Sequence, residues 1–421
     1  MAVVYQLTLP LTQAPKLLSE LLPLVLTHLS HKDLQAASLV CREWVAPAQS
    51  LIHHLLVIST YGQLTCAERL YTSYPHLRPL VKQFELRLEQ EFQNPDTIPI
   101  GFERIQHLLP LLTSVRQLWI ANLFDLSAEK RAALAPLSQL EELTLETSNL
   151  QNVDRYEIED FDQILKHWSQ LHHLTLRCFL FAEHDGVPSA RCPASFSDLY
   201  LFGSLFTDEE LEWLLSGSNS LKTFEYVQLK LKGTEELDFS RMLAGFGAMF
   251  GIPVPPQAPS APKVIPKATP EGLVALIAAR GGQLRKLYLG VEKLKPDDIA
   301  QILSATPNLE ILGIPLISVD DTTTSSAPST LHTFQLYLLP ESDVVTEEAL
   351  KLAVGRLSSM KLDFVDEIEL SNIYGGLAYE GLEKEICKIG EEKGIEVWQR
   401  DRFFHHWYPA KRLSPAPEES T

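Results

Sequence analysis

The sequence predicts an α/β fold: parallel strands stacked into an open solenoid with helices on the convex side, preceded by a small all-α module. Two observations support this prediction. A short pattern with apolar residues at its first, fourth and sixth positions returns ten times after residue 80, and three short amphipathic segments occupy residues 17–44. A single strand-and-helix unit has too little core to stand alone, so neighbouring units must stack.

Residues 17–44 read LLSELLPLVLTHLSHKDLQAASLVCREW and predict the all-α module. Ser30 and Asp33 fit a capping box that opens its second helix. The first helix carries a wide apolar stripe at helical spacing, Leu21, Leu22, Val25, Leu26 and Leu29. So much apolar surface on so short a unit must be covered by the rest of the chain or by another protein.

This segment resembles an F-box, the motif through which substrate receptors attach to the Skp adaptor of cullin-RING ubiquitin ligases. The residues that match the family pattern are Leu17, Glu20, Leu21, Leu22, Val25, Leu29, Asp33, Leu34, Val40, Cys41, Arg42 and Trp44. One departure is Leu18, which stands at the usual proline position, while Pro23 lies near the helix start. The resemblance makes Cys41 a packed helix residue. It implies that the adaptor-docking residues are Leu17, Leu21, Val25, Leu34, Val40 and Trp44, some of which also serve the internal packing of the module.

The recurring apolar pattern predicts the strands of the solenoid. It begins at Val81, Val115, Leu140, Leu171, Phe196, Leu221, Leu284, Leu309, Leu331 and Val365. Most steps between starts are 22 to 34 residues, with one gap of 63. This array is similar to the leucine-rich repeats that follow F-boxes in many receptors, whose period is about 20 to 29 residues. Helical patterns with capping residues follow several strands, beginning after Thr207, Asp297 and Thr346.

These patterns predict three regions. Residues 1–60 form the F-box region, with its core at 17–48, and residues 61–400 form the solenoid. Inside the long gap, residues 251–270 carry seven prolines and predict a loop excursion, with a proline-rich ligand for a partner as the alternative. Residues 401–421 include four aromatic residues and predict a terminal cap and tail, with a docking peptide as the alternative.

Composition limits the classes of partner. A formal net charge of −18, from 54 acidic and 36 basic residues, argues against nucleic-acid binding, which needs a concentrated basic surface. No apolar stretch reaches the ~18 to 20 residues that span a bilayer, so we predict no membrane partner. Five cysteines at irregular spacing predict reduced thiols, and no secretory signal is recognised. Together these features favour a cytoplasmic or nuclear protein.

No catalytic or cofactor motif is recognised, and we predict that the chain is not an enzyme. Five residues close in sequence could be imagined as zinc ligands, His172, His173, Cys178, His184 and Cys192. Their spacing fits no familiar zinc pattern, and the two adjacent histidines lie on a predicted strand, so we predict neither a metal site nor a cofactor.

The strands offer a recognition surface. Because side chains alternate along a strand, the third and fifth pattern positions face the concave side. They include six acids and three aromatics against one lysine, which favours a basic or mixed protein segment as the partner. The candidate substrate-binding residues are Glu85, Trp119, Glu142, Tyr200, Glu225 and Tyr288.

The sequence therefore predicts the substrate-recognition subunit of a Skp-cullin-F-box ubiquitin ligase. Its F-box would bind the Skp adaptor and, through it, a cullin, while the solenoid would hold a protein substrate. The alternative is a repeat scaffold that does not engage a ligase, which Leu18 at the usual proline position leaves open.

Overall fold

The fold was analysed in a computed structural model of the 421-residue chain. The structure describes residues 21–86, 105–121, 123, 126–146, 155–182, 184, 186–228, 268–291, 294–338, 347–362, 365–372, 380–403, 406–407 and 411–412. The chain divides into two compact units, Met1–Leu118 and Trp119–Thr421.

The first unit contains the all-α module, hereafter the helical module, which consists of α1 (Leu21–Leu26), α2 (His31–Ala37) and α3 (Arg42–Ile52). The Ser30 hydroxyl caps α2, since it accepts the Asp33 amide at 3.2 Å and donates to the Asp33 carboxylate at 2.6 Å. The small core of the module is formed by Leu22, Leu26, Leu34, Ala37 and Ala48, with Leu29, Trp44, Leu51 and Ile52 packed against it.

A strand–helix–strand segment follows the helical module in the same unit. Strand β1 (Leu55–Ile58) pairs in parallel with β2 (Gln83–Leu86), and α4 (Tyr61–Ser73) and a 3-10 turn (Pro75–Leu80) connect them. A capping box between Thr60 and Gln63 begins α4. A second 3-10 turn (Leu109–Leu111) precedes β3 (Gln117–Ala121), which spans the boundary between the units.

The second unit is built on a parallel sheet. Its strands pair in chain order, which leaves the sheet open. They are β4 (Glu142–Glu146), β6 (His173–Arg177), β8 (Asp198–Phe202), β9 (Thr223–Val227), β10 (Lys286–Gly290), β11 (Ile311–Pro315), β12 (Thr333–Leu338), β13 (Glu367–Asn372) and β14 (Glu396–Phe403). The long gap does not interrupt the sheet, because β9 and β10 pair directly.

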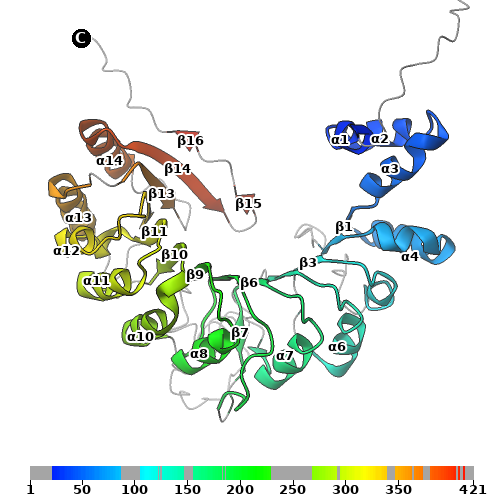
Figure 1. The fold of residues 1–421 in the computed structure, drawn as a ribbon, viewed down its shortest axis with the longest axis horizontal. Helices are drawn as coiled ribbons and strands as arrows, with labels where there is room; N and C mark the ends of the chain where they lie inside the picture. The colour runs from blue at the N-terminus through cyan, green and yellow to red at the C-terminus, as the bar shows by residue number, and fades with distance from the viewer. Residues whose placement is uncertain are drawn as a thin grey trace, which may run out of the picture. The chain divides into compact units, whose positions relative to one another are not determined.

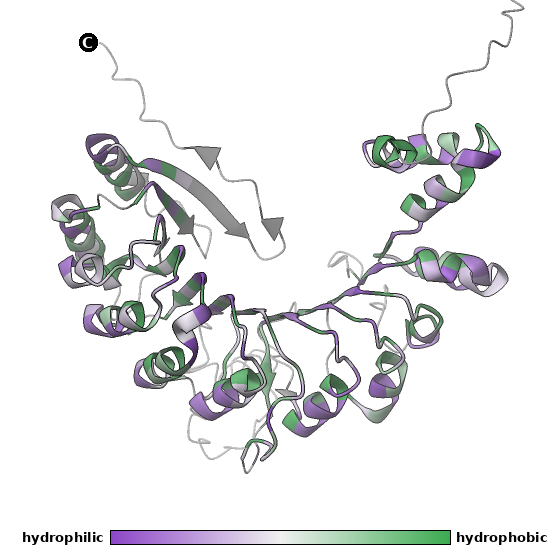
Figure 2. Cartoon of the chain, in the orientation of Figure 1, coloured by the Kyte–Doolittle hydropathy of each residue, from purple (hydrophilic) through white to green (hydrophobic). Residues whose placement is uncertain are grey.

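Helices lie on the outer side of the strand row in this unit (Figure 1). They are α6 (Ala128–Leu134), α7 (Ile158–Leu165), α8 (Asp208–Ser216), α10 (Pro270–Arg280), α11 (Pro296–Ala305), α12 (Asp321–Ser325), α13 (Glu347–Ser359) and α14 (Glu380–Lys393). Figure 2 shows hydrophobic residues on the helix sides that face the strands. The predicted fold class, a helical module followed by an open parallel solenoid, is confirmed.

The core of the second unit is a ladder of apolar side chains that runs from strand to strand. Leu174, Leu199 and Leu287 are each fully buried, and the register aligns Leu174 with Leu199 and both Leu199 and Leu287 with Phe224. Behind the ladder, aromatic rings fill the space toward α7 and α8; the Tyr156 and Phe179 rings stack with centroids 4.3 Å apart. A short two-stranded sheet, β5 (Arg155–Tyr156) with β7 (Leu180–Phe181), carries part of this cluster.

Some predicted boundaries differ from the structure. Lys295 rather than Asp297 is the N-cap of α11, because Pro296 takes the first helical position. Pro270 is not part of a loop, since it opens α10 behind the N-cap Thr269. Thr346 and residues 251–267 lie outside the described residues. Near the C-terminus, β15 (His406–Trp407) and β16 (Lys411–Arg412) pair antiparallel with β14.

Candidate functional site

Helix α1 is apolar on two sides. Leu22 and Leu26, four residues apart, face the core of the helical module, with 5% and 0% of their surface exposed. Leu21, Leu24 and Val25 lie on the other side and are 46%, 62% and 46% exposed. The predicted stripe is therefore split, because a module of three short helices has room to bury only one side of α1.

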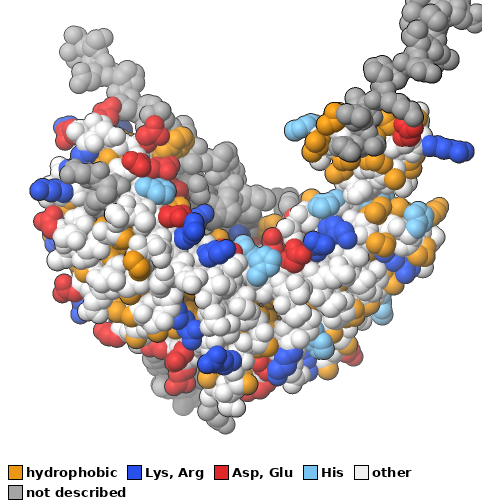
Figure 3. Space-filling model, in the orientation of Figure 1, with side chains coloured by type: hydrophobic (Ala, Val, Ile, Leu, Met, Phe, Trp, Pro, Cys, Tyr) orange, Lys and Arg blue, Asp and Glu red, His pale blue; other side chains and the backbone are white. Residues whose placement is uncertain are grey.

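A second group of exposed apolar residues follows α2. Leu39 is 86% exposed and Val40 is 65% exposed, and Figure 3 shows hydrophobic side chains gathered over the helical module. Exposed apolar side chains in such a concentration are typical of a surface that another protein covers. We call Leu21, Leu24, Val25, Leu39 and Val40 the apolar face.

The predicted docking residues divide between this face and the core. Leu21, Val25 and Val40 belong to the apolar face. Leu34, only 7% exposed, is a core residue, and the partly buried Trp44 packs against that core, so both side chains serve internal packing in this structure. Leu17 lies outside the described residues.

Two members of the apolar face, Leu24 and Leu39, were not among the predicted docking residues. The signal was present in the sequence, since apolar residues occupy every position of α1 except Pro23.

The position of Cys41 also differs from the prediction, which made it a packed residue within a helix. It is exposed and forms the N-cap of α3, and its side chain makes no capping hydrogen bond.

The predicted concave-face residues are less exposed than their strand positions suggest. Glu225 on β9 is only 3% exposed in this structure. The remaining candidates are half-buried, namely Glu85, Trp119, Glu142, Tyr200 and Tyr288. Glu369 and Gln335 on this face are also buried. Strand alternation fixes the direction of a side chain, whereas its exposure depends on what packs over it.

The half-buried part of this face includes a group on β4, β6 and β8. The register aligns Glu142, His173 and Asp198 side by side, and the His173 ring lies 5.0 Å from that of Tyr200, centroid to centroid. Burial lowers the pKa of His173, while the carboxylates of Glu142 and Asp198 raise it and His172 lowers it. A histidine between two carboxylates suits hydrogen bonding to a partner, and the Thr175 hydroxyl lies 3.4 Å from its Nε2.

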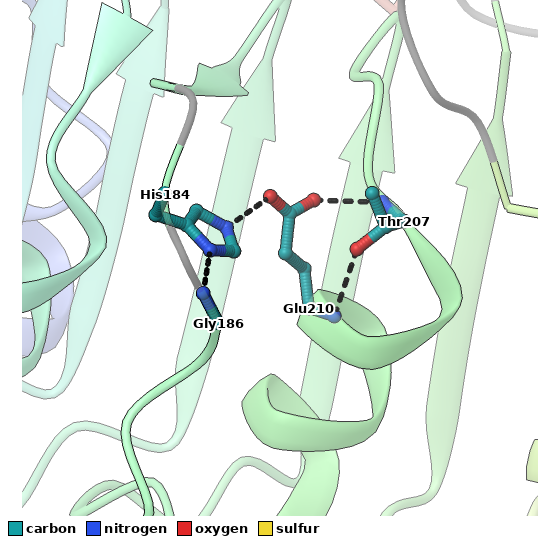
Figure 4. Close-up of polar contacts among 4 residues, drawn as sticks. All are labelled: His184, Gly186, Thr207 and Glu210. Atoms are coloured by element: carbon teal, nitrogen blue, oxygen red, sulfur yellow. Dashed lines mark hydrogen bonds and ion pairs between the residues drawn. The ribbon is translucent and has the colours of Figure 1, made fainter.

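The five imagined zinc ligands do not converge. His184 is instead held by α8, because its Nε2 lies 2.8 Å from the Glu210 carboxylate and its Nδ1 accepts the Gly186 amide at 3.2 Å (Figure 4). Burial raises the pKa of the Cys178 and Cys192 thiols to about 12, so neither supplies a ready thiolate. Among the described residues, no group of three or more histidine, cysteine or acidic side chains is arranged to hold a metal ion.

Comparison with known families identifies the helical module. Residues 15–45 match the family model of the F-box domain. The matched F-box segment includes α1, α2 and the first turn of α3, and so carries the whole apolar face. F-box domains bind Skp-type adaptors of ubiquitin ligases. None of the curated proteins searched matches the chain.

Two solved structures are similar to the chain. The yeast Rad7 and Elc1 complex matches at 14% identity with a TM-score of 0.35, over 89% of this chain and 73% of that one. The TLR13–ssRNA13 complex matches at 12% identity with a TM-score of 0.26, over 79% of this chain and 55% of that one. Within the described part of the chain, no helix combines the length and the apolar character needed to cross a bilayer.

Proposed function

We propose that this chain is the substrate-recognition subunit of a Skp-cullin-F-box ubiquitin ligase. Its F-box domain binds the Skp adaptor, and the adaptor brings the cullin. The sheet of the second unit holds a protein substrate. The observation that carries the proposal is the apolar face on a segment that matches the F-box family model.

The apolar face supports the proposal energetically. Full burial of one leucine or valine side chain is worth roughly 1.5 to 3 kcal/mol, so five such side chains could supply most of the free energy of a stable complex. The F-box core already uses Leu22, Leu26 and Leu34, so the exposed residues can be covered without unfolding the domain. The face is preformed, and binding loses little conformational entropy.

The chemistry of ubiquitin transfer would lie in other subunits. This chain contributes proximity, because a substrate held on the same assembly meets the transferring enzyme at a high effective concentration. Such a subunit would act in the cytoplasm or the nucleus. All five cysteines are free thiols, as a reducing compartment requires.

The proposal is tested by co-purification with the Skp adaptor. Wild type should form a stable complex, and Leu21→Asp or Val25→Asp should weaken it by about thirtyfold or more, since each places an unpaired charge in the buried interface. The matched control is Leu352→Asp on α13, because Leu352 is also exposed, at 58%, but lies outside the F-box. The control should bind as wild type does.

If wild type, Leu21→Asp, Val25→Asp and Leu352→Asp all bound the adaptor equally well, the apolar face would be rejected as the docking surface. If wild type captured no adaptor, the chain would instead be a repeat scaffold outside the ligase system. Cullin in the purified complex would support the complete proposal, and its absence from an adaptor-bound sample would limit the assignment to adaptor binding.

A further inference from the structure

One residue immediately precedes each of the sheet strands β4, β6 and β8 to β13, and these residues form a continuous row. The row comprises Glu141, His172, Ser197, Lys222, Arg285, Glu310, His332 and Asp366, which we call the start row. Each residue after the first donates its backbone amide to the carbonyl of the one before it, at 2.7–3.1 Å. The order of charges along the row is therefore fixed by the sheet itself.

Positive charge is concentrated at the middle of this row. Lys222 and Arg285 are adjacent, and Lys286, the first residue of β10, lies beside them because its amide donates to the Lys222 carbonyl at 3.0 Å. Acidic residues stand at both ends, Glu141 and Asp366. In Figure 3, Lys and Arg side chains gather over β9 and β10 with an acidic side chain next to them.

All three cations are accessible. Lys222, Arg285 and Lys286 are exposed. Arg285 lies 3.1 Å from the Glu310 carboxylate, and its side chain is still 61% exposed. Neither Lys222 nor Lys286 makes an ion pair with any residue that the structure describes. A partner could thus gain two lysine contacts without first breaking an internal pair.

From this arrangement we propose that Lys222, Arg285 and Lys286 bind an anionic segment of a protein substrate, one that carries clustered carboxylate or phosphate groups. The inference rests on the proposed function in treating the bound segment as a substrate. It differs from the predicted preference for a basic or mixed segment, which counted acids such as Glu225 and Glu369 that are buried in this structure.

The spacing of the strands and the acidic residues at both ends of the start row favour a short peptide segment over a nucleic acid. Neighbouring strands are about 4.8 Å apart, so cations from β9 and β10 can reach adjacent anionic side chains of one chain. A nucleic acid would extend past the cations toward the acidic ends of the row, in a chain whose net charge is −18. The attraction is local, since salt screens exposed charges beyond about 8 to 10 Å.

The test uses the full-length chain and fluorescently labelled peptides. The probes are an oligoglutamate peptide, a phosphoserine-rich peptide of the same length and an oligolysine peptide. The test variant combines Lys222→Glu with Lys286→Glu. The control combines Lys384→Glu with Lys388→Glu on α14, which changes the net charge equally at exposed positions of another face.

Wild type should bind at least one anionic peptide, more weakly as salt rises. The test variant should bind it about tenfold more weakly, whereas the control should stay within about twofold of wild type. If only the phosphoserine-rich peptide bound, the site would recognise phosphate groups. If oligoglutamate bound with comparable affinity, carboxylate groups would be sufficient for binding. Preference for oligolysine, or equal affinity of both double variants, would overturn the inference.

Adaptor capture by the same proteins separates this inference from the proposed function. Both double variants should retain adaptor binding, because none of the four lysines lies in the F-box. If wild type bound the anionic peptide and not the adaptor, the ligase role would fail while the anion-binding surface remained.

Discussion

The F-box domain leaves large apolar side chains in contact with solvent, whereas the strands of the second unit bury almost all of theirs. Leu21, Leu24 and Val25 are 46% to 62% exposed, while Leu174 and Leu199 in the sheet are fully buried. In the F-box only three short helices share a core. In the sheet every strand has a neighbour that covers its aliphatic positions.

This difference indicates two modes of recognition in one chain. An apolar face gains free energy from leaving water and suits a permanent partner of fixed shape. A row of exposed charges gains less from each contact, but it discriminates between partners by sign. The F-box therefore suits a constant subunit, and the start row suits a choice among substrates.

The largest expected effect is on the buried ladder. Leu199→Ala should lower the free energy of unfolding by about 2 to 5 kcal/mol, because it leaves a cavity between Leu174 and Phe224. Val25→Ala should change that free energy by less than about 0.5 kcal/mol and yet weaken adaptor binding. Chemical denaturation of both variants provides the measurement. Similar destabilisation by the two substitutions would remove the distinction between covered and uncovered apolar residues.

A smaller loss is expected at the capping contact of α8. Glu210 accepts the Thr207 amide at 2.7 Å and contacts His184 at 2.8 Å, and it is only 4% exposed. Glu210→Ala removes both contacts and should lower the free energy of unfolding by about 1 to 3 kcal/mol. The control is Glu209→Ala, an exposed acid in the same first turn, which should have only a minor effect. Matching melting curves for both variants would show that this network contributes no stability.

The strands of the ladder could be predicted because each one is encoded by residues that are close together in the sequence. All ten predicted strands are present, since the alternation of apolar and polar residues within six positions encodes each one. Two further strands of the parallel sheet, β1 and β14, were missed, as were the short strands β5, β7, β15 and β16. Strand β14 breaks the pattern, because Gln399 is aligned with Leu370, the sixth-position aliphatic residue of β13, and β1 is apolar at all four positions.

The candidate sites were less predictable, since exposure is a property of packing between distant residues. Spacing alone could not separate Val25 from Leu26, although one is 46% exposed and the other fully buried. Strand parity placed Glu225 on the concave side but gave no information on its burial. The start row was missed because the pattern treats its position as variable, and only the register brings Lys222 beside Arg285.

The smallest predicted effect concerns a histidine between the F-box and the segment that follows it. His53 ends α3, and its Nδ1 lies 3.3 Å from the Tyr71 hydroxyl of α4. Burial lowers the pKa of His53 below its ordinary 6.5, with His31 and His76 adding repulsion. The unfolded chain therefore binds this proton more readily than the folded one, so stability falls as pH decreases through about 6.5.

Melting temperatures compared between about pH 7.5 and about pH 5.5 test this dependence. His53→Gln should reduce it, while the contribution of His173, whose pKa burial also lowers, remains. Tyr71→Phe should keep most of it, because burial rather than the phenol contact is the first cause of the shift. If His53→Gln retained the wild-type dependence while Tyr71→Phe abolished it, the hydrogen bond and not the burial of His53 would control the acid sensitivity of this junction.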